Sequence, residues 1–145
     1  MVDLGRQSAK ATVGEPFPVS ATVFREGHDK LAAEVVLITP PGDRLPPVRM
    51  EKLADPVDRY RAWVTPTSMG AWTFEVHAWS DPVATWEHAA AIKVPAGIDV
   101  ELMFTEARLL LERVRDELPT KAKAEAKVLA GALEAAGDTS RPDEA

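Results

Sequence analysis

Apolar and polar residues alternate over much of the first hundred positions, and this pattern predicts β-strands. The clearest example is residues 17–23, where Phe, Val, Ala and Val occupy every second position, the period of a strand with one buried face. Further strands are predicted at residues 33–39, at residues 59–64 and, more weakly, at residues 49–54. Strands this close together, separated by proline and glycine, predict a mainly β protein with an immunoglobulin-like antiparallel β-sandwich over residues 1–97.

The stretch "HAWSDPVATWEH" at residues 77–88 is interpreted as the centre of a β-hairpin. Its arms would be residues 72–79 and residues 85–94, because apolar side chains fall on one parity in each. Asp81 and Pro82 suit the first two positions of a type I turn between the arms. The register that joins the two apolar faces then decides which side chains meet across the hairpin.

That register separates the two histidines of the stretch. Val76 would face His88, which is therefore expected to be a core histidine with a hydrogen-bond partner. His77 would face Glu87 as an exposed cross-strand pair. A zinc site needs three or four ligands that converge on one point. No metal site is therefore predicted here.

After Gly97 the apolar residues recur at helical spacing, and residues 98–137 are predicted to form a helical hairpin. The first helix would begin with Asp99 as its N-cap and stop at Pro119. The second would have Thr120 as its cap and Gly137 as its C′ residue. The stripe of the first helix is Leu102 or Met103, Ala107, Leu110, Leu111, Val114 and Leu118; that of the second is Ala122, Ala126, Leu129 and Leu133. Residues 138–145 are predicted to be a mobile tail.

Composition narrows the classes of function. The 145 residues have a formal net charge of −6 and contain no cysteine. An acidic chain is a poor match for nucleic acid or an anionic membrane, so neither is an expected partner. The absence of cysteine excludes thiol catalysis and fits a reducing compartment, and the start of the chain has no apolar core of a signal peptide. A cytoplasmic location is expected.

Catalytic templates are missing from the sequence. It has no nucleophile elbow, phosphate-binding glycine loop, dinucleotide fingerprint or zinc-protease helix motif. The polar cluster in "FREGHDK" at residues 24–30 is better explained as a turn held by local hydrogen bonds. No catalytic residue, cofactor or metal ligand is therefore predicted.

The four tryptophans are the more open question. By strand parity Trp72 and Trp86 are expected to face inward, whereas Trp63 and Trp79 point outward. An exposed indole can stack on a sugar ring, so Trp79 and Trp63 are candidate glycan contacts. The alternative is that neighbouring protein surface covers them, since tryptophan commonly fills cores and interfaces.

Two long segments carry a resemblance to a known family. They are residues 9–37, with the block "VFREGHD", and residues 70–97, with the block "AWSDPVATWEH". Together they resemble the amino-terminal region of the bacterial α-1,4-glucan:maltose-1-phosphate maltosyltransferases, which belong to the α-amylase superfamily. The resemblance covers most of residues 8–118.

The resemblance implies a parent enzyme that transfers maltosyl units from maltose 1-phosphate to α-1,4-glucans with retention of configuration. It implies an amino-terminal sandwich with a helical insertion, both contributing to a homodimer, and a catalytic barrel that these 145 residues lack. No catalytic residue of that barrel can be carried over to this chain. The expected function is a non-catalytic accessory and dimerisation domain; the alternative is a carbohydrate-binding module that uses exposed tryptophans on an α-glucan.

Overall fold

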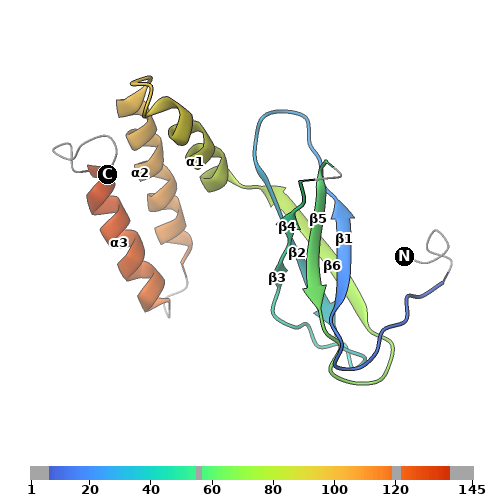
Figure 1. Ribbon diagram of the computed structural model, residues 1–145. Coiled ribbons are helices and arrows are strands. Elements are labelled where there is room, and N and C mark those ends of the chain that lie inside the picture. Colours follow the sequence, from blue (N-terminus) through green and yellow to red (C-terminus); the bar gives the residue numbers. More distant parts are fainter. Residues whose placement is uncertain (1–6, 55–56, 119–121, 138–145) are drawn as a thin grey trace. The chain divides into compact units, whose positions relative to one another are not determined.

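The computed structural model describes residues 7–54, 57–118 and 122–137, in which six strands precede three helices (Figure 1). The chain divides into two compact units. The first holds the strands and comprises the residues up to Gly27 together with Leu31–Ser80. The second holds the helices and comprises His28–Lys30 and the residues from Asp81 onward. The helical part therefore begins at Asp81, well before the predicted boundary at residue 98.

The first sheet has the strand order β1-β5-β4 and is antiparallel. Strand β1 is Phe17–Thr22, β5 is Arg59–Val64 and β4 is Glu51–Lys52. Every residue of β1 has a partner on β5, from Phe17 opposite Val64 to Thr22 opposite Arg59. The strands predicted at residues 17–23 and 59–64 are thus confirmed.

The second sheet has the order β3-β2-β6 and is also antiparallel. Strand β3 is Val48–Arg49, β2 is Leu31–Ile38 and β6 is Thr73–Ser80. All eight residues of β2 pair with β6. This confirms the central apolar strand, and the weak prediction at residues 49–54 corresponds to the two short strands β3 and β4.

One hydrophobic core draws on both sheets. Its buried members are Val19, Ala33, Val35, Leu37, Met50, Tyr60, Ala62 and Val64. Because side chains alternate along a strand, the inward positions of β2 and β5 meet in this core and the other parity points outward. The hydroxyl of Tyr60 on β5 donates a 3.0 Å hydrogen bond to the carbonyl oxygen of Leu31 on β2. This bond joins the two sheets directly.

The predicted hairpin is wrong, because its second arm is a helix. Helix α1 spans Pro82–Lys93 and begins immediately after β6. The carboxylate of Asp81 accepts a 3.0 Å hydrogen bond from the backbone N–H of Ala84, and Pro82 occupies the first turn. Aspartate at the N-cap with proline at N1 is a strong helix start, and the alanines that follow are good helix formers. The same two residues that suit a turn therefore start a helix.

Helix α2, Val100–Glu117, agrees with the predicted first helix. Met103 and Ala107 of the predicted stripe are buried. Asp99 occupies the N-cap position but makes no capping hydrogen bond, since its backbone is left-handed with φ 53°. Its carboxylate instead pairs with Lys93 at 3.0 Å. The predicted start of the helix is confirmed, but the prediction that the Asp99 side chain caps it is wrong.

Helix α3 spans Lys123–Gly137 and packs against α2, as α1 also does (Figure 1). Gly137 is the last residue of this helix and not the residue beyond it. Thr120 and the predicted tail at residues 138–145 lie outside the described residues. The antiparallel strands and the carboxy-terminal helices are confirmed, but the class is mixed α and β, and the described part of the chain has three helices where two were predicted.

Candidate functional site

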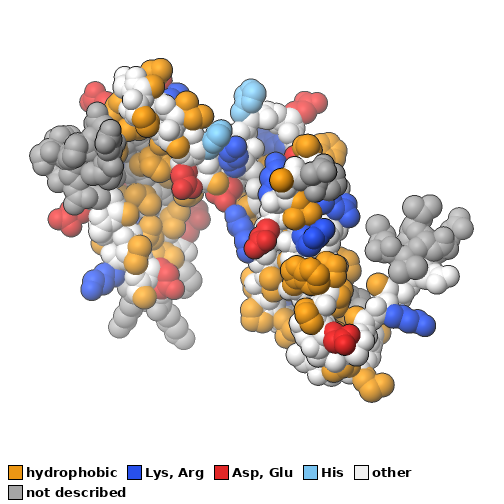
Figure 2. Space-filling view, in the orientation of Figure 1, with side chains coloured by type: hydrophobic (Ala, Val, Ile, Leu, Met, Phe, Trp, Pro, Cys, Tyr) orange, Lys and Arg blue, Asp and Glu red, His pale blue; other side chains and the backbone are white. Residues whose placement is uncertain are grey.

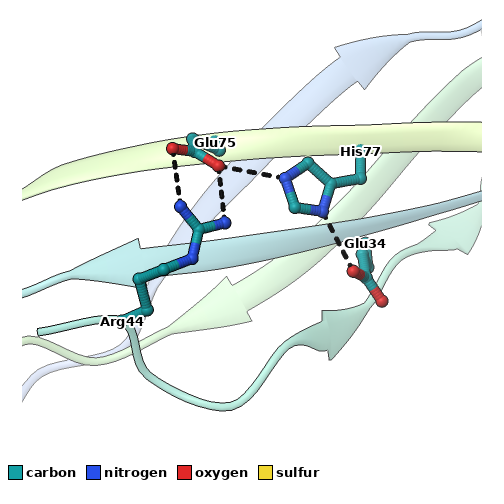
Figure 3. Close-up of polar contacts among 4 residues, drawn as sticks. All are labelled: Glu34, Arg44, Glu75 and His77. Carbon is teal, nitrogen blue, oxygen red and sulfur yellow. Dashed lines mark hydrogen bonds and ion pairs between the residues drawn. The ribbon is translucent and has the colours of Figure 1, made fainter.

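The most organised polar cluster lies on the outward face of the sheet β3-β2-β6 (Figure 3). It consists of Glu75 and His77 from β6, Glu34 from β2 and Arg44 from the proline-rich loop after β2. Glu75 and His77 are two residues apart, so they point to the same side of the strand. His77 and Glu34 are register partners on adjacent strands.

The cluster is held by short, charge-assisted contacts. The guanidinium of Arg44 donates two hydrogen bonds to the carboxylate of Glu75, at 2.9 and 2.7 Å. The imidazole of His77 bridges two carboxylates, with Nε2 3.0 Å from Glu75 and Nδ1 3.1 Å from Glu34. The four side chains therefore form a continuous chain of alternating donors and acceptors across the sheet.

These contacts shift the ionisation of the cluster. The hydrogen bonds from Arg44 and then from His77 lower the pKa of Glu75 to about 2. The hydrogen bonds to Glu75 and then to Glu34 raise the pKa of His77 above its ordinary value of 6.5. A carboxylate held ionised in this way is a poor proton acceptor near neutral pH. The four side chains are therefore better suited to holding β2, β6 and the loop after β2 together than to general acid–base catalysis.

Sequence reasoning identified only part of this cluster. The cross-strand pairing of His77 with a glutamate was predicted, but the partner is Glu34 and not Glu87, because β6 pairs with β2. Arg44 was not singled out, since nothing local in a proline-rich loop indicates that its side chain reaches Glu75. Among the described residues, no group of three His, Cys, Asp or Glu side chains is arranged to hold a metal ion.

Two further predictions derived from the hairpin are corrected. His88 is an exposed residue of α1 and not a core histidine. Trp86 lies on the same helix, half-buried, and its indole N–H donates a 2.7 Å hydrogen bond to the carbonyl oxygen of Met103 on α2. Its inward orientation thus serves the packing of two helices. Trp72 packs against the core of the sheets, as predicted.

The two candidate glycan contacts are both exposed, on different sheets. Trp79 lies on β6 with 38% of its surface exposed, and the guanidinium of Arg49 sits over its ring, 4.9 Å from the centroid. Trp63 lies on β5 and is 58% exposed, on the opposite parity from the buried Ala62 and Val64. Since the inward faces of the two sheets share one core, the two indoles point away from each other. A single platform built from both is therefore excluded.

The fold and these features define a small two-sheet unit followed by a helical unit, with exposed aromatic and ionic groups on the sheets. No helix among the described residues is long and apolar enough to cross a membrane. The family model for domain N/S of alpha-1,4-glucan:maltose-1-phosphate maltosyltransferase matches residues 1–145. The chain belongs to this family.

Individual relatives agree with the family match. Alpha-1,4-glucan:maltose-1-phosphate maltosyltransferase 2 of Streptomyces coelicolor is 55% identical over 119 residues, covering 82% of this chain and 18% of the relative. Maltosyltransferase 1 of the same organism is 46% identical over 142 residues, covering 98% of this chain and 21% of the relative. The Mycolicibacterium smegmatis maltosyltransferase is 37% identical over 152 residues, covering 83% of this chain and 22% of the relative. The chain thus spans about a fifth of the length of these relatives.

Proposed function

We propose that this chain is the non-catalytic accessory and dimerisation domain of a maltosyltransferase that transfers maltosyl units from maltose 1-phosphate to α-1,4-glucan. The observation that carries the proposal is the match of the domain N/S family model along all 145 residues. The chemistry of the proposed parent belongs to other parts of a longer protein, since the relatives are about five times longer. The absence of cysteine is consistent with a cytoplasmic enzyme.

The two sheets support an immunoglobulin-like sandwich as the architecture of the first unit. In that fold, strands B, E and D lie together in one sheet, and strands C and F lie together in the other. The orders β1-β5-β4 and β3-β2-β6 match B-E-D and C′-C-F when the strands are taken in chain order. The shared core and the bond from Tyr60 to Leu31 agree with face-to-face packing.

The helical unit supports the dimerisation role through apolar side chains that its own helices leave uncovered. Leu102 and Leu109 are 51% and 54% exposed and lie seven residues apart on α2, which places them on one side of the helix. This side differs from the one that buries Met103 and Ala107. Val128 on α3 is 73% exposed, and apolar side chains gather on the visible face of the helices (Figure 2). Exposed apolar surface of this kind commonly marks a site where a second protein binds, because binding removes the apolar side chains from water.

The dimerisation role is tested by sedimentation velocity over a range of micromolar protein concentrations. We expect a reversible dimer of the 145-residue chain, and a shift to monomer in the double variant Leu102→Ser, Leu109→Ser. The matched control is Met69→Ser, since Met69 is 89% exposed in the sheet unit and should not affect association. A chain that stays monomeric at all concentrations would contradict the role.

A second candidate function is α-glucan binding through Trp79 or Trp63, favoured by the exposure of both rings. The assay is affinity electrophoresis in gels containing glycogen or amylopectin. Retardation that is lost in Trp79→Ala or Trp63→Ala would support this function. Phe24→Ala removes an aromatic side chain that is 76% exposed outside the strands and is the matched control. Unchanged mobility of the native chain would exclude binding of these glucans.

A further inference from the structure

The outward face of the sheet β1-β5-β4 places an exposed indole beside an exposed proline. Trp63 on β5 is 58% exposed, and its register partner on the adjacent strand β1 is Pro18, which is also exposed (Figure 1). Paired residues of adjacent antiparallel strands project to the same face, so the two rings lie next to each other. They form a small apolar surface on a face that is otherwise polar. We call this side of the sheet the Trp63 face.

A row of polar side chains lies next to these rings on the Trp63 face. Ser20, Arg61 and Glu51 hold neighbouring positions on β1, β5 and β4. Side chains two residues apart on a strand are separated by about 6.7 Å, so this row is one step along β5 from the indole. The row combines a hydroxyl, a guanidinium and a carboxylate, and therefore both donors and acceptors. Within the described part of the chain, none of these three side chains takes part in a hydrogen bond or an ion pair.

The surroundings of Trp79 differ in both respects. The guanidinium of Arg49 lies over its ring, 4.9 Å from the centroid. The polar side chains beside it on that face, Glu34, His77 and Glu75, are engaged in the ion cluster. A sugar on Trp79 would have to displace the guanidinium, and its hydroxyls would compete with hydrogen bonds that already exist. Trp63 has an open ring with uncommitted polar groups next to it.

We propose that the Trp63 face binds a neutral α-glucan chain, with one sugar ring stacked on the indole of Trp63 and its hydroxyls hydrogen-bonded by Arg61, Ser20 and Glu51. Stacking removes the apolar face of the sugar and that of the indole from water. A sugar hydroxyl both donates and accepts, as the polar row requires. The opposite charges of Arg61 and Glu51 favour a neutral ligand over an anion. The inference rests on the second candidate function and narrows it from two indoles to one.

A site of this size is weak for a short oligosaccharide. One stacked ring and a few hydrogen bonds on an open face predict a dissociation constant on the order of 1 mM. A polymer presents many equivalent sugar units, so a released chain rebinds at a high effective concentration. The Trp63 face would therefore retain polymeric glucan near the proposed parent enzyme without supplying a reacting group.

An NMR titration of the ¹⁵N-labelled 145-residue chain with maltoheptaose tests the proposal. We expect the indole N–H signal of Trp63 and the backbone amide signals of Ser20 and Arg61 to shift, while the indole signal of Trp79 stays in place. Because the shifts are mapped on the native chain, this result does not depend on the folding of any variant.

Substitutions provide the second readout. Trp63→Ala should abolish the shifts at Ser20 and Arg61, and Arg61→Ala should weaken binding about fivefold, as expected for the loss of one hydrogen bond. Arg49→Ala is the matched control, because it removes an arginine from the other sheet and uncovers the ring of Trp79. The affinity for maltoheptaose should not change in this variant.

The outcomes separate this inference from the function on which it rests. Shifts centred on Trp79, lost in Trp79→Ala or strengthened in Arg49→Ala, would overturn the inference and leave glucan binding by the chain intact. Native affinity in Trp63→Ala would overturn it as well. A native chain that shows no shift with maltoheptaose would refute both the Trp63 face and the second candidate function.

Discussion

Replacing Tyr60 by phenylalanine tests whether the two sheets are joined as the structure shows. Tyr60 is 3% exposed, and its hydroxyl donates a 3.0 Å hydrogen bond to the carbonyl oxygen of Leu31 in the other sheet. Tyr60→Phe keeps the ring and removes only this donor. An intramolecular hydrogen bond of this kind contributes a net free energy of about 1 kcal/mol. The free energy of unfolding should therefore fall by about 1 kcal/mol, roughly a fivefold change in the ratio of folded to unfolded protein.

Urea unfolding followed by tryptophan fluorescence measures this change. The midpoint should fall with an unchanged slope, since the surface exposed on unfolding is the same. Tyr60→Ala also removes the ring from the core and should cost about 3 to 5 kcal/mol. Arg61→Gln, the next residue on the outward face of β5, is the control and should stay within about 0.5 kcal/mol of the native chain. A stability of Tyr60→Phe equal to that of the native chain would refute the hydrogen bond between the sheets.

Four further outcomes follow from the contacts described above. Asp81→Ala removes the cap of α1 and should lower the free energy of unfolding of the helical unit by about 1 kcal/mol, measured by circular dichroism at the helix band, whereas Asp81→Asn should lose only a few tenths. Val35→Ala, at a position that is 0% exposed, should cost about 2 kcal/mol in urea unfolding, and an unchanged midpoint would argue against the core. The pKa of His77 is raised in the folded chain, so stability should decrease as the pH rises from about 6.5 through that raised value, and His77→Gln should remove this slope. The pKa of Glu75 is lowered to about 2 from 4.5, so its contribution should be present above pH 4.5 and be lost as the pH falls toward 2; a loss that persists in Glu75→Gln would contradict this assignment.

The hairpin shows where local pattern reasoning failed. Residues 85–94 contain apolar side chains on alternate positions, but the same residues are rich in alanine, and alternation over a short alanine-rich stretch also fits a helix. Asp81 and Pro82 suit both a turn and a helix start. The helix prevails because the Asp81 carboxylate caps it through the backbone N–H of Ala84 and the alanines that follow favour a helix, while β6 pairs with β2.

The features of the candidate site were also predicted only in part. Exposure of Trp63 and Trp79 followed correctly from strand parity, because parity is a local property of the backbone. The ion cluster did not follow, because it joins residues 31 and 43 positions apart through the pairing of β2 with β6 and the path of the loop that carries Arg44. Its residues share no local signature.

The sequence by itself determined the strands β1, β2, β5 and β6, helix α2 with the buried Met103 and Ala107 of its predicted stripe, and membership of the maltosyltransferase domain family. These depend on side-chain periodicity and on long stretches of shared residues, both of which are local. Only the tertiary structure decided which strands pair and which glutamates hold His77. Those features depend on contacts between distant segments, whose free energies are comparable for several alternative pairings until a common core selects one.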